Sequence, residues 1–342
     1  MKSIRLRPLI FIIILFAVHT ASAANVFVPT FDLTSWINLK AEIETRGQFD
    51  LALDGGYKYQ AQVSFQYYNL DIESNPAQSI IFNGASASVR GIMNRLDVTY
   101  FTGFYDVIGK GTHYKGHLYH RESGFEYDGF YPVVGTGIIP SVKIADWMNS
   151  ALYLYQRSGS EYVNSMDITL GLAKDPLTFS LFTGVSGTQY KIGAEFAFRK
   201  DNIEFYLTAG TLSISKSSSF DFDDFYFLSE EWFKMNRWNL ILSVFTRPEV
   251  HYNSVQRRYI ATEERSDIDF NFDLYHTFKG EKVIAGGEYN IQTNKTDDFG
   301  IYLSPYVSLY TSGLAWKIKL DFNLISESRD FITAYLNLQS SF

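Results

Sequence analysis

The sequence has no cysteine and only eight prolines. Without cysteine there is no disulfide framework, no lipid-modified N-terminal cysteine and no metal site built from thiolates. The chain also lacks an excess of positive charge, since its formal net charge is −7. Nucleic-acid binding normally needs a basic surface, so we predict no nucleic-acid partner. Scarce proline and an aromatic content of 17% favour strands over helices.

The first 23 residues have the three parts of a secretory signal peptide: a basic start, an apolar run of ten residues and a small-residue cleavage site. These parts are Lys2, Arg5 and Arg7, then Leu9 to Val18, then Ala21-Ser22-Ala23. The run is too short for a membrane-spanning helix, which needs about 20 apolar residues. We predict cleavage after residue 23 and a single domain over residues 24–342; the alternative is a retained N-terminal anchor. Because the leader holds three basic residues and no acidic one, the mature chain is more acidic than the whole.

Strict alternation runs from Ile37 to Leu53. Odd positions are apolar or small, whereas even positions are polar and include Lys40, Glu42, Glu44, Arg46 and Asp50. Successive side chains on a strand point to opposite faces, so these five charged residues are predicted to share one face. The turn signal Asp54-Gly55-Gly56 follows. We therefore predict one long strand with an apolar face and a charged face.

The same alternation recurs to the end of the chain. Asp267, Asp269 and Asp273 oppose Ile268, Phe270 and Phe272, and Lys317, Lys319 and Asp321 oppose Trp316, Ile318 and Leu320. Further strands are predicted near 57–67, 80–91, 95–106, 147–157, 161–173, 176–186, 188–199, 202–214, 222–234, 237–247, 283–291, 300–312 and 332–342. No stretch has the pattern of a long amphipathic helix, and no linker or low-complexity segment interrupts the chain.

Tight turns alternate with longer loops such as 107–132, 247–266 and 292–300. Short turns at one end and longer loops at the other are typical of bacterial outer-membrane barrels. Trp147, Trp232, Trp238 and Trp316 all fall near the short-turn end, where an interfacial aromatic girdle is expected. A soluble β-sandwich or lectin-like domain also alternates, but the export signal, the long strands and the scarce proline favour a barrel.

The final strand carries the closest resemblance to a known class. It ends on Phe342, with Leu338, Leu336 and Ala334 at alternate positions. With the leader and the repeated alternation, the chain resembles Gram-negative outer-membrane β-barrels of the porin-like type. The resemblance covers nearly all of the mature chain and implies that Leu336, Leu338 and Phe342 form a signal for the barrel-assembly machinery. Ser340 departs from the pattern, because a larger apolar residue is more usual there.

The resemblance implies an all-β fold: a transmembrane, antiparallel, up-and-down barrel in the cell outer membrane. Both ends of such a chain lie in the periplasm, so its strand number is even. Seventeen segments alternate, and the stretch 133–144, which contains glycine and proline, is the one we assign to a loop. We predict about sixteen strands, within a range of 14–18.

Charged inner faces imply a water-filled or salt-bridged interior, because unpaired buried charges are prohibitive. Such arrays tune the charge preference of a channel, so we predict passive diffusion of small hydrophilic solutes. Acidic residues outnumber basic ones on the three polar faces described above, which predicts a preference for cations. The alternative is a closed structural or adhesin barrel whose surface loops bind a host or envelope partner.

One predicted loop is rich in histidine and basic residues. His113, Lys115, His117, His120 and Arg121 lie within nine positions of one another. Histidine spacings of four and three suit a metal on a helix, but glycines and the two cations argue against it. We predict an ordinary constriction or surface loop, no metal and no cofactor. A cluster of cations folded inward from this loop would reverse the charge preference of the pore.

A barrel hydrolase is the remaining alternative. His251-Tyr252-Asn253-Ser254 supplies a histidine and a serine, but neighbours in sequence do not by themselves form an activated pair. The sequence contains neither Gly-x-Ser-x-Gly nor His-Glu-x-x-His. We predict that the protein is not an enzyme, and the sequence indicates neither its solute nor its oligomeric state.

Overall fold

The computed structural model describes most of the chain after the leader. The described residues are 25–28, 30–38, 43–54, 58–68, 80–109, 130–157, 163–215, 225–246, 250–253, 258–261, 266–278, 280, 282–294, 299–311, 313–325 and 331–341. In these ranges no helix is long and apolar enough to cross a membrane. The predicted signal peptide lies outside them.

The described secondary structure consists of strands. In chain order they are β1 (Asn25–Phe27), β2 (Thr30–Asn38), β3 (Ile43–Asp54), β4 (Tyr59–Tyr68), β5 (Ile80–Ile92), β6 (Leu96–Ile108), β7 (Tyr131–Ala145), β8 (Met148–Arg157), β9 (Val163–Lys174), β10 (Leu177–Ser186), β11 (Gln189–Lys200), β12 (Ile203–Ser215), β13 (Phe225–Met235), β14 (Trp238–Thr246), β15 (Val250–Asn253), β16 (Arg258–Ala261), β17 (Ser266–Thr277), β18 (Val283–Asn294), β19 (Phe299–Thr311), β20 (Leu314–Asn323) and β21 (Ile332–Ser341).

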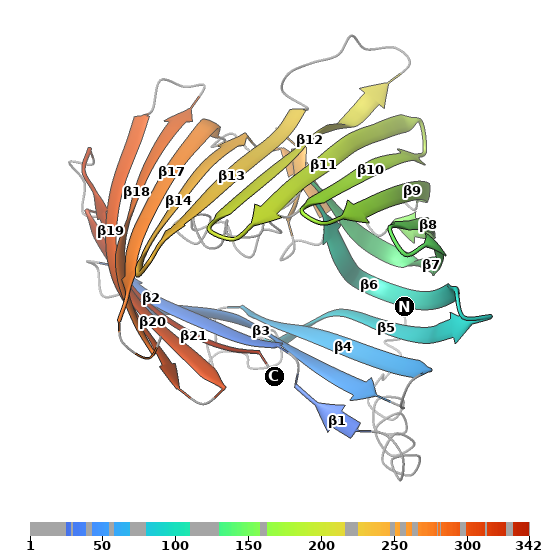
Figure 1. Cartoon of the computed structure of the whole chain (residues 1–342), viewed down its shortest axis with the longest axis horizontal. Helices are drawn as coiled ribbons and strands as arrows, with labels where there is room; N and C mark the ends of the chain where they lie inside the picture. Colours follow the sequence, from blue (N-terminus) through green and yellow to red (C-terminus); the bar gives the residue numbers. More distant parts are fainter. Residues whose placement is uncertain are drawn as a thin grey trace, which may run out of the picture.

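Each long strand pairs antiparallel with its neighbours in the chain, as an up-and-down meander (Figure 1). The meander runs from β2 to β14 and continues from β17 to β21, which gives eighteen long strands. β2 pairs with β21 as well as with β3, so the pairings return to their start. The short β1 pairs with β3 beyond β2, and β15 pairs with β16 in a separate hairpin. Every long strand is thus paired on both sides along most of its length, as a membrane interior requires.

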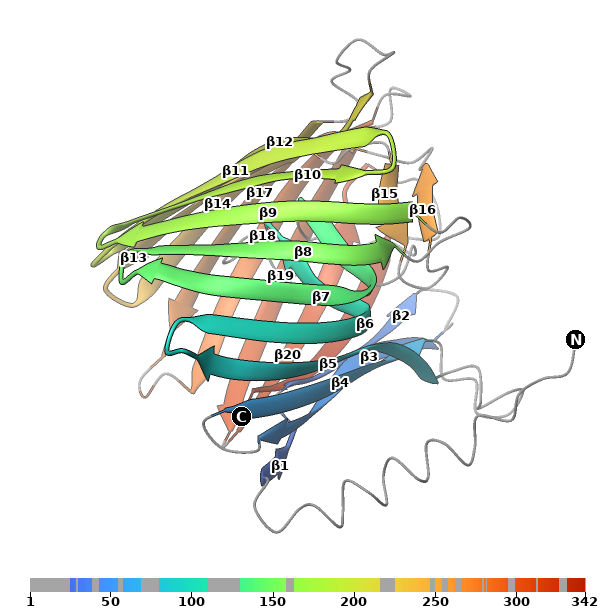
Figure 2. The same ribbon diagram turned by 90° about the vertical axis from the view of Figure 1, so that its right-hand side faces the viewer.

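Tight turns and longer connections lie at opposite ends of the strands (Figure 2). Two residues join β9 to β10, β11 to β12 and β13 to β14. Asp201 and Asn236 in the last two turns have φ of 45° and 62°, the left-handed conformation that two-residue hairpin turns require. The connections of β6 to β7 and of β14 to β17 are much longer and lie at the other end. These connections follow the predicted division between short turns and long loops, whereas β10 and β11 are joined by only two residues at the loop end.

Two details of the strand assignment were wrong. The segment Ile37–Leu53 is not one strand: β2 ends at Asn38 and β3 begins at Ile43, and the two pair as a hairpin. The stretch 133–144, assigned above to a loop, belongs to β7. Gly137 fits in this strand because a Cβ there would lie 2.3 Å from the Cβ of Tyr155. Pro140 lies where the pairing with β8 is interrupted. The eighteen long strands fall at the upper end of the predicted range.

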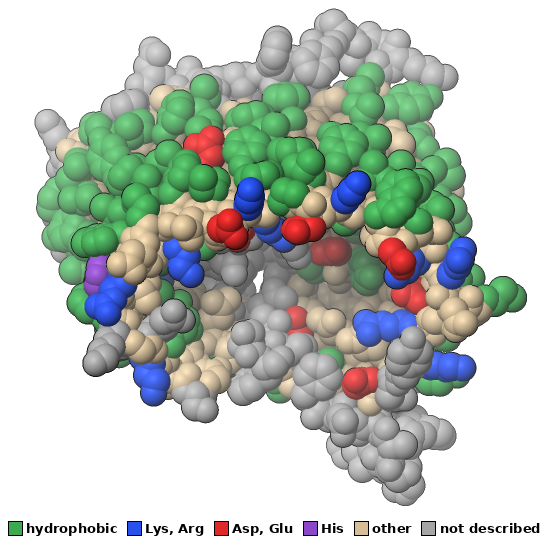
Figure 3. Space-filling view, viewed as in Figure 1, with side chains coloured by type: hydrophobic (Ala, Val, Ile, Leu, Met, Phe, Trp, Pro, Cys, Tyr) green, Lys and Arg blue, Asp and Glu red, His purple; other side chains and the backbone are tan. Residues whose placement is uncertain are grey.

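The outer surface is apolar along most of the strands (Figure 3). Ile318, Phe272 and Leu303 are examples, each between 41% and 58% exposed. Trp147, Trp238 and Trp316 are also exposed near the short-turn end, as expected for an interfacial girdle. Trp232 was wrongly included in that girdle. It alternates with the buried Glu230 and Leu228 on the inner face of β13.

Candidate solute pathway

Four neighbouring strands, β17 to β20, present a charged wall to the interior. Alternation turns Asp269, Asp273, Glu288, Lys319 and Asp321 inward, while Phe270, Tyr289, Leu303 and Ile318 are exposed on the outside. Residues 267–273 and 317–321 were predicted from sequence as separate polar faces. The strand order makes them parts of one wall, with β18 and β19 between them.

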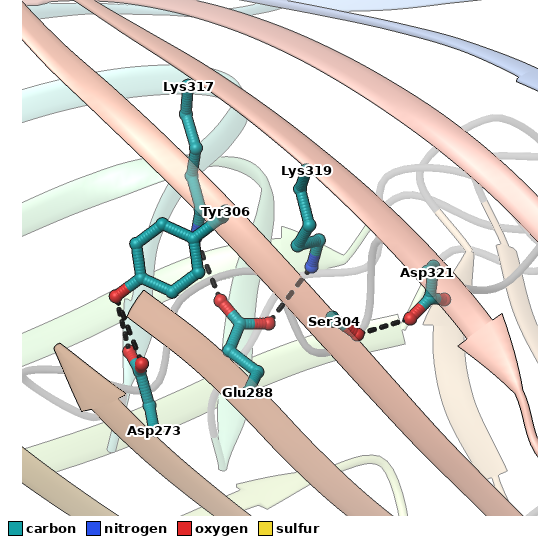
Figure 4. Close-up of polar contacts among 7 residues, drawn as sticks. All are labelled: Asp273, Glu288, Ser304, Tyr306, Lys317, Lys319 and Asp321. Atoms are coloured by element: carbon teal, nitrogen blue, oxygen red, sulfur yellow. Dashed lines mark hydrogen bonds and ion pairs between the residues drawn. The ribbon is translucent and has the colours of Figure 1, made fainter. Parts of the chain in front are cut away.

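Glu288 is the centre of this wall (Figure 4). Its Oε1 lies 2.8 Å from Nζ of Lys317, and its Oε2 lies 3.0 Å from Nζ of Lys319. The side chains of Glu288 and Lys319 are only 3% and 7% exposed, whereas that of Lys317 is 31% exposed. One carboxylate therefore pairs with two ammonium groups, and that of Lys317 remains partly exposed.

Two further polar contacts extend the wall on either side of Glu288 (Figure 4). The Tyr306 hydroxyl donates to Asp273, at 3.0 and 3.2 Å from the two carboxylate oxygens. Nζ of Lys317 lies 4.1 Å from the centroid of the Tyr306 ring, within cation–π distance. The Ser304 hydroxyl donates to Asp321. Lys317 thus joins the Tyr306–Asp273 contact to Glu288, and the Ser304–Asp321 bond lies beside this group (Figure 4).

The structure brings together only some of the residues predicted to line the lumen. Asp269, Asp273, Lys317, Lys319 and Asp321 belong to the wall. Asp50 on β3 is buried elsewhere and accepts a hydrogen bond from Gln62 at 3.1 Å. The remaining residues are not described in their side chains: Glu44 and Arg46 on β3, Asp267 on β17, and Lys40 and Glu42 between β2 and β3.

Glu288 was missed in the sequence, although its signal is present. In the predicted strand 283–291, the alternate residues Gly287, Tyr289 and Ile291 are apolar or small, which leaves Glu288 and Asn290 for the inner face. Both are now seen to be buried. What sequence cannot supply is the register that sets Glu288 opposite Ser304 on β19 and within reach of β20.

A second ion pair lies on the inner face of β9 and β11. Nζ of Lys191 is 2.6 Å from Asp167, and both side chains are at most 1% exposed. The Tyr155 hydroxyl donates to Asp167 at 2.7 Å and also bonds the Tyr131 hydroxyl at 2.7 Å. Lys191 lies 3.8 Å from the centroid of the Tyr131 ring. This cluster ties the start of β7 to the wall formed by β8, β9 and β11.

The ends of β6 and β7 nearest their connecting loop turn into the interior. β7 pairs with β6 from Tyr131, but with β8 only from Gly135. Tyr131, Val133 and Val134 are at most 3% exposed, so both faces of this segment are covered. Figure 1 shows β6 curving toward β11 and β12. We call residues 104–109 and 130–134 the inward segment.

Phe130 fixes the inward segment against the opposite wall. Its ring lies where a Cβ on Gly193 or on Gly210 would be, at 2.6 Å in each case. The ring also contacts Phe182 and Tyr226, with centroids 5.6 and 5.8 Å away. The Tyr226 hydroxyl donates to the backbone oxygen of Gly109 at 3.3 Å. The Phe130 ring thus packs directly on two glycines of the opposite wall.

The inward segment borders two cavities, and Asp106 and Val107 line both. The first, of about 440 Å³, lies against β3, β4 and β5; it is lined by Asp50, Gln60, Gln62, Ser86, Ser88 and Arg90. The second, of about 490 Å³, lies against β9 to β12 and has a mixed polar and apolar lining. Both are large enough for small solutes. Figure 3 shows the hollow centre of the molecule with charged side chains around it.

The remaining predicted sites are only partly covered. His113, Lys115, His117, His120 and Arg121 lie outside the described residues, in the connection between the two halves of the inward segment. No group of three potential metal ligands occurs among the residues that are described. In the predicted assembly signal, Leu336 is exposed on the outer face of β21 and Leu338 shares that alternation, whereas Phe342 is not described.

No protein-family model and no curated protein matches the chain. Solved structures do resemble it. The outer-membrane protein OpdK from Pseudomonas aeruginosa matches with a TM-score of 0.56 and 12% identity, over 93% of this chain and 98% of that one. Wzi, an outer-membrane protein involved in group 1 capsule assembly in Escherichia coli, matches with a TM-score of 0.57 and 11% identity, over 100% and 90%. A triple mutant of the Rhodopseudomonas blastica porin matches with a TM-score of 0.52 and 9% identity, over 93% and 100%.

Identities this low establish a shared fold alone. That fold is the outer-membrane β-barrel, as the alternation and the C-terminal strand predicted. The continuous strand pairing and the apolar outer surface are what a barrel needs in a bilayer. The chain is therefore a porin-like outer-membrane barrel without assignment to a specific family.

Proposed function

We propose that this outer-membrane β-barrel is a channel for passive diffusion of small hydrophilic solutes. The observation that carries the proposal is the pair of cavities beside the inward segment, of about 440 and 490 Å³. A barrel whose interior is completely filled by side chains leaves no such space. Polar side chains line both cavities, so water is expected to occupy them.

The charged wall also supports a channel function. Lys317 is 31% exposed although it pairs with Glu288, so its ammonium group borders open interior. Charged groups that line an aqueous route set which ions and solutes enter it. Among the neighbours, the Rhodopseudomonas blastica protein is a porin, and OpdK has been crystallised with vanillate.

The finer proposal is a preference for cations. Acidic groups outnumber basic ones on the described inner surface: Asp50, Asp106, Asp167, Glu195, Glu230, Asp269, Asp273, Glu288 and Asp321 stand against Arg90, Lys191, Arg199, Lys317 and Lys319. A narrow lumen concentrates the field of uncompensated charge. The preference should be strongest at low salt, where the Debye length reaches about 30 Å at 0.01 M. Histidines and cations of the 107–132 loop would weaken or reverse it if they face the lumen.

A second candidate is a closed structural or adhesin barrel. The aromatic cluster around Phe130 and Phe182 fills part of the interior, which is the specific observation in its favour. Wzi, described as a carbohydrate-binding barrel involved in capsule assembly, has the same fold. In this alternative the surface loops would bind a partner and no solute would cross.

Assembly into the membrane is a further part of the proposal. Leu336, Leu338 and Phe342 would be recognised by the barrel-assembly machinery, since they stand at even positions of the C-terminal sequence, as the resemblance to porin-like barrels implies. Deleting Phe342 should lower the yield of folded, membrane-inserted protein in cells. Unchanged insertion after this deletion would argue against that role.

Liposome swelling separates the two candidate functions. Proteoliposomes with purified, folded protein are diluted into isotonic solutions of glycine, glucose and raffinose. The channel predicts swelling that slows as the solute becomes larger. Folded protein that causes no swelling with any of the three would favour the closed barrel.

A further inference from the structure

The cavity of about 490 Å³ beside the inward segment has features of a binding site. It lies on the inner side of β9 to β12 and is closed on one side by residues of the inward segment. Hydroxyl, carboxylate, guanidinium and aromatic groups share its lining. A concave site with a few convergent polar groups on an apolar wall is the usual form of a small-molecule site.

Two buried hydroxyl groups in this cavity lack a hydrogen bond of normal geometry to any described residue. Tyr206 and Thr208 are two residues apart on the inner face of β12 and are 8% and 1% exposed. Neither hydroxyl makes a hydrogen bond of normal geometry with a described residue, and the two lie close enough to affect each other. Leaving a buried hydroxyl unsatisfied costs about 1–3 kcal/mol. Two such groups side by side in one cavity therefore point to a ligand that bonds them.

The apolar part of the lining consists of aromatic rings. Phe130 and Phe182 pack edge to face, with centroids 5.6 Å apart, and both border the cavity together with Tyr206. The face of an aromatic ring is its negative side and attracts hydrogens that carry partial positive charge. A saturated ring with a C–H face fits against such a wall.

The charges of the cavity limit the charge of its ligand. Asp106 and Glu195 both line it, and the one guanidinium there, Arg199, lies 3.5 Å from Glu204. An anionic solute would meet two carboxylates and a cation that already has an acidic neighbour. A neutral solute with several hydroxyls can donate to the carboxylates and bond the hydroxyls of Tyr206 and Thr208.

From these observations we propose that the cavity binds a small neutral sugar, of about the size of a monosaccharide. The inference deepens the proposed channel function, on which it rests, by naming the class of solute that pauses at this point of the lumen. The hydroxyls of Tyr206 and Thr208 bond the sugar hydroxyls, and the Phe130 and Phe182 rings support its C–H face.

Binding is measured on the folded protein in detergent micelles by saturation-transfer NMR, with D-glucose as the probe and benzoate as an anionic comparison. Tyr206→Phe and Thr208→Val each remove one hydroxyl and change little else. Ser86→Ala removes a hydroxyl from the other cavity and is the matched control. We expect glucose binding whose Kd rises about three- to tenfold in each of the two variants, the loss of one hydrogen bond, and stays unchanged in the control.

Three results would overturn the inference: no glucose binding to the unaltered protein, binding that neither variant weakens, or tighter binding of benzoate than of glucose. Because a hydroxyl without a partner contributes nothing to folding, Tyr206→Phe is expected to fold normally. The test does not depend on conductance. A barrel that binds glucose but does not conduct in bilayers would contradict the proposed channel and not the sugar site. A barrel that conducts but does not bind glucose would contradict the sugar site and not the channel.

Discussion

At the residue scale, the charged wall depends on Glu288. A buried carboxylate that pairs with two lysines is costly to remove, because each ammonium group then loses this ion pair while it stays partly or fully desolvated. Lys319 is the more buried of the two, and Lys317 borders open interior. The same side chain therefore affects both the stability of the barrel and the field in its lumen.

Glu288→Gln should shift ion selectivity toward anions, because it removes one carboxylate of the wall while both lysines keep their charge. The folded state should also lose stability, by less than the roughly 3–5 kcal/mol of a fully buried broken pair, since Lys317 is partly solvated. Reversal potentials in a potassium chloride gradient measure the first effect, and heat-modifiable gel mobility the second. Adding Lys319→Met removes the more buried of the two cations and restores the net charge of the wall, so it should reverse part of both effects. An unchanged reversal potential in Glu288→Gln would show that the wall does not border the conducting route.

Sequence could identify which residues face inward but not which of them meet. Asp269, Asp273, Lys317, Lys319 and Asp321 were assigned to the inner surface from their alternation alone. Their meeting at Glu288 and Tyr306 depends on the stagger between strands, which residue character does not encode. The ion pair of Lys191 with Asp167 was missed for the same reason.

At the scale of elements, the inward segment decides how much of the lumen is open. It is held by Lys191, which pairs with Asp167 and contacts the Tyr131 ring, and by the packing of Phe130 on two glycines. A glycine in a strand often marks a close approach of another group. Here that group is an aromatic ring that belongs to a distant part of the sequence.

Gly193→Ala should displace Phe130, since the added Cβ would lie 2.6 Å from its ring. Overpacking of this kind typically costs about 1–3 kcal/mol, and the displaced segment should change the single-channel conductance. Gly287→Ala is the matched control, because a Cβ there has nothing within 4 Å. Equal stability and equal conductance of the two variants would show that Phe130 does not hold the segment in place.

The hairpin of β2 and β3 explains why one strand boundary could not be predicted. Thr34 pairs with Arg46 and Leu33 with Gly47, so even positions pair with even positions across the turn. The alternation consequently continues without a break from one strand into the next, and no glycine or proline marks the reversal. In β7 the error was the opposite, because Gly137 and Pro140 suggested a loop where close packing and interrupted pairing accommodate both.

At the scale of the whole molecule, the fold follows from two surfaces of opposite character. The period-two alternation made this predictable from the sequence, and the spacing of the strands indicated where the longest loops lie. The number of strands was harder to predict, since it depends on where the chain turns from one strand into the next. The outer apolar surface should be sensitive to charge in proportion to depth in the bilayer.

Ile318→Arg should therefore destabilise the barrel more than Ile203→Arg. Ile318 lies mid-strand on the outer face of β20 and is 58% exposed, whereas Ile203 is the first residue of β12, at the short-turn end, and is 46% exposed. An outward arginine costs about 2–4 kcal/mol at the bilayer midplane and about 0–1 near the interfaces. Urea unfolding in lipid vesicles compares them, and equal losses would contradict a membrane-spanning outer surface.

The central claim is that the lumen conducts, and single-channel recording in planar bilayers tests it most directly. Purified protein whose folding is verified by heat-modifiable mobility is added to a bilayer in potassium chloride. The account predicts stable, ohmic openings whose reversal potential in a salt gradient indicates cation preference, more so at low salt. Persistent silence from folded, inserted protein would contradict it.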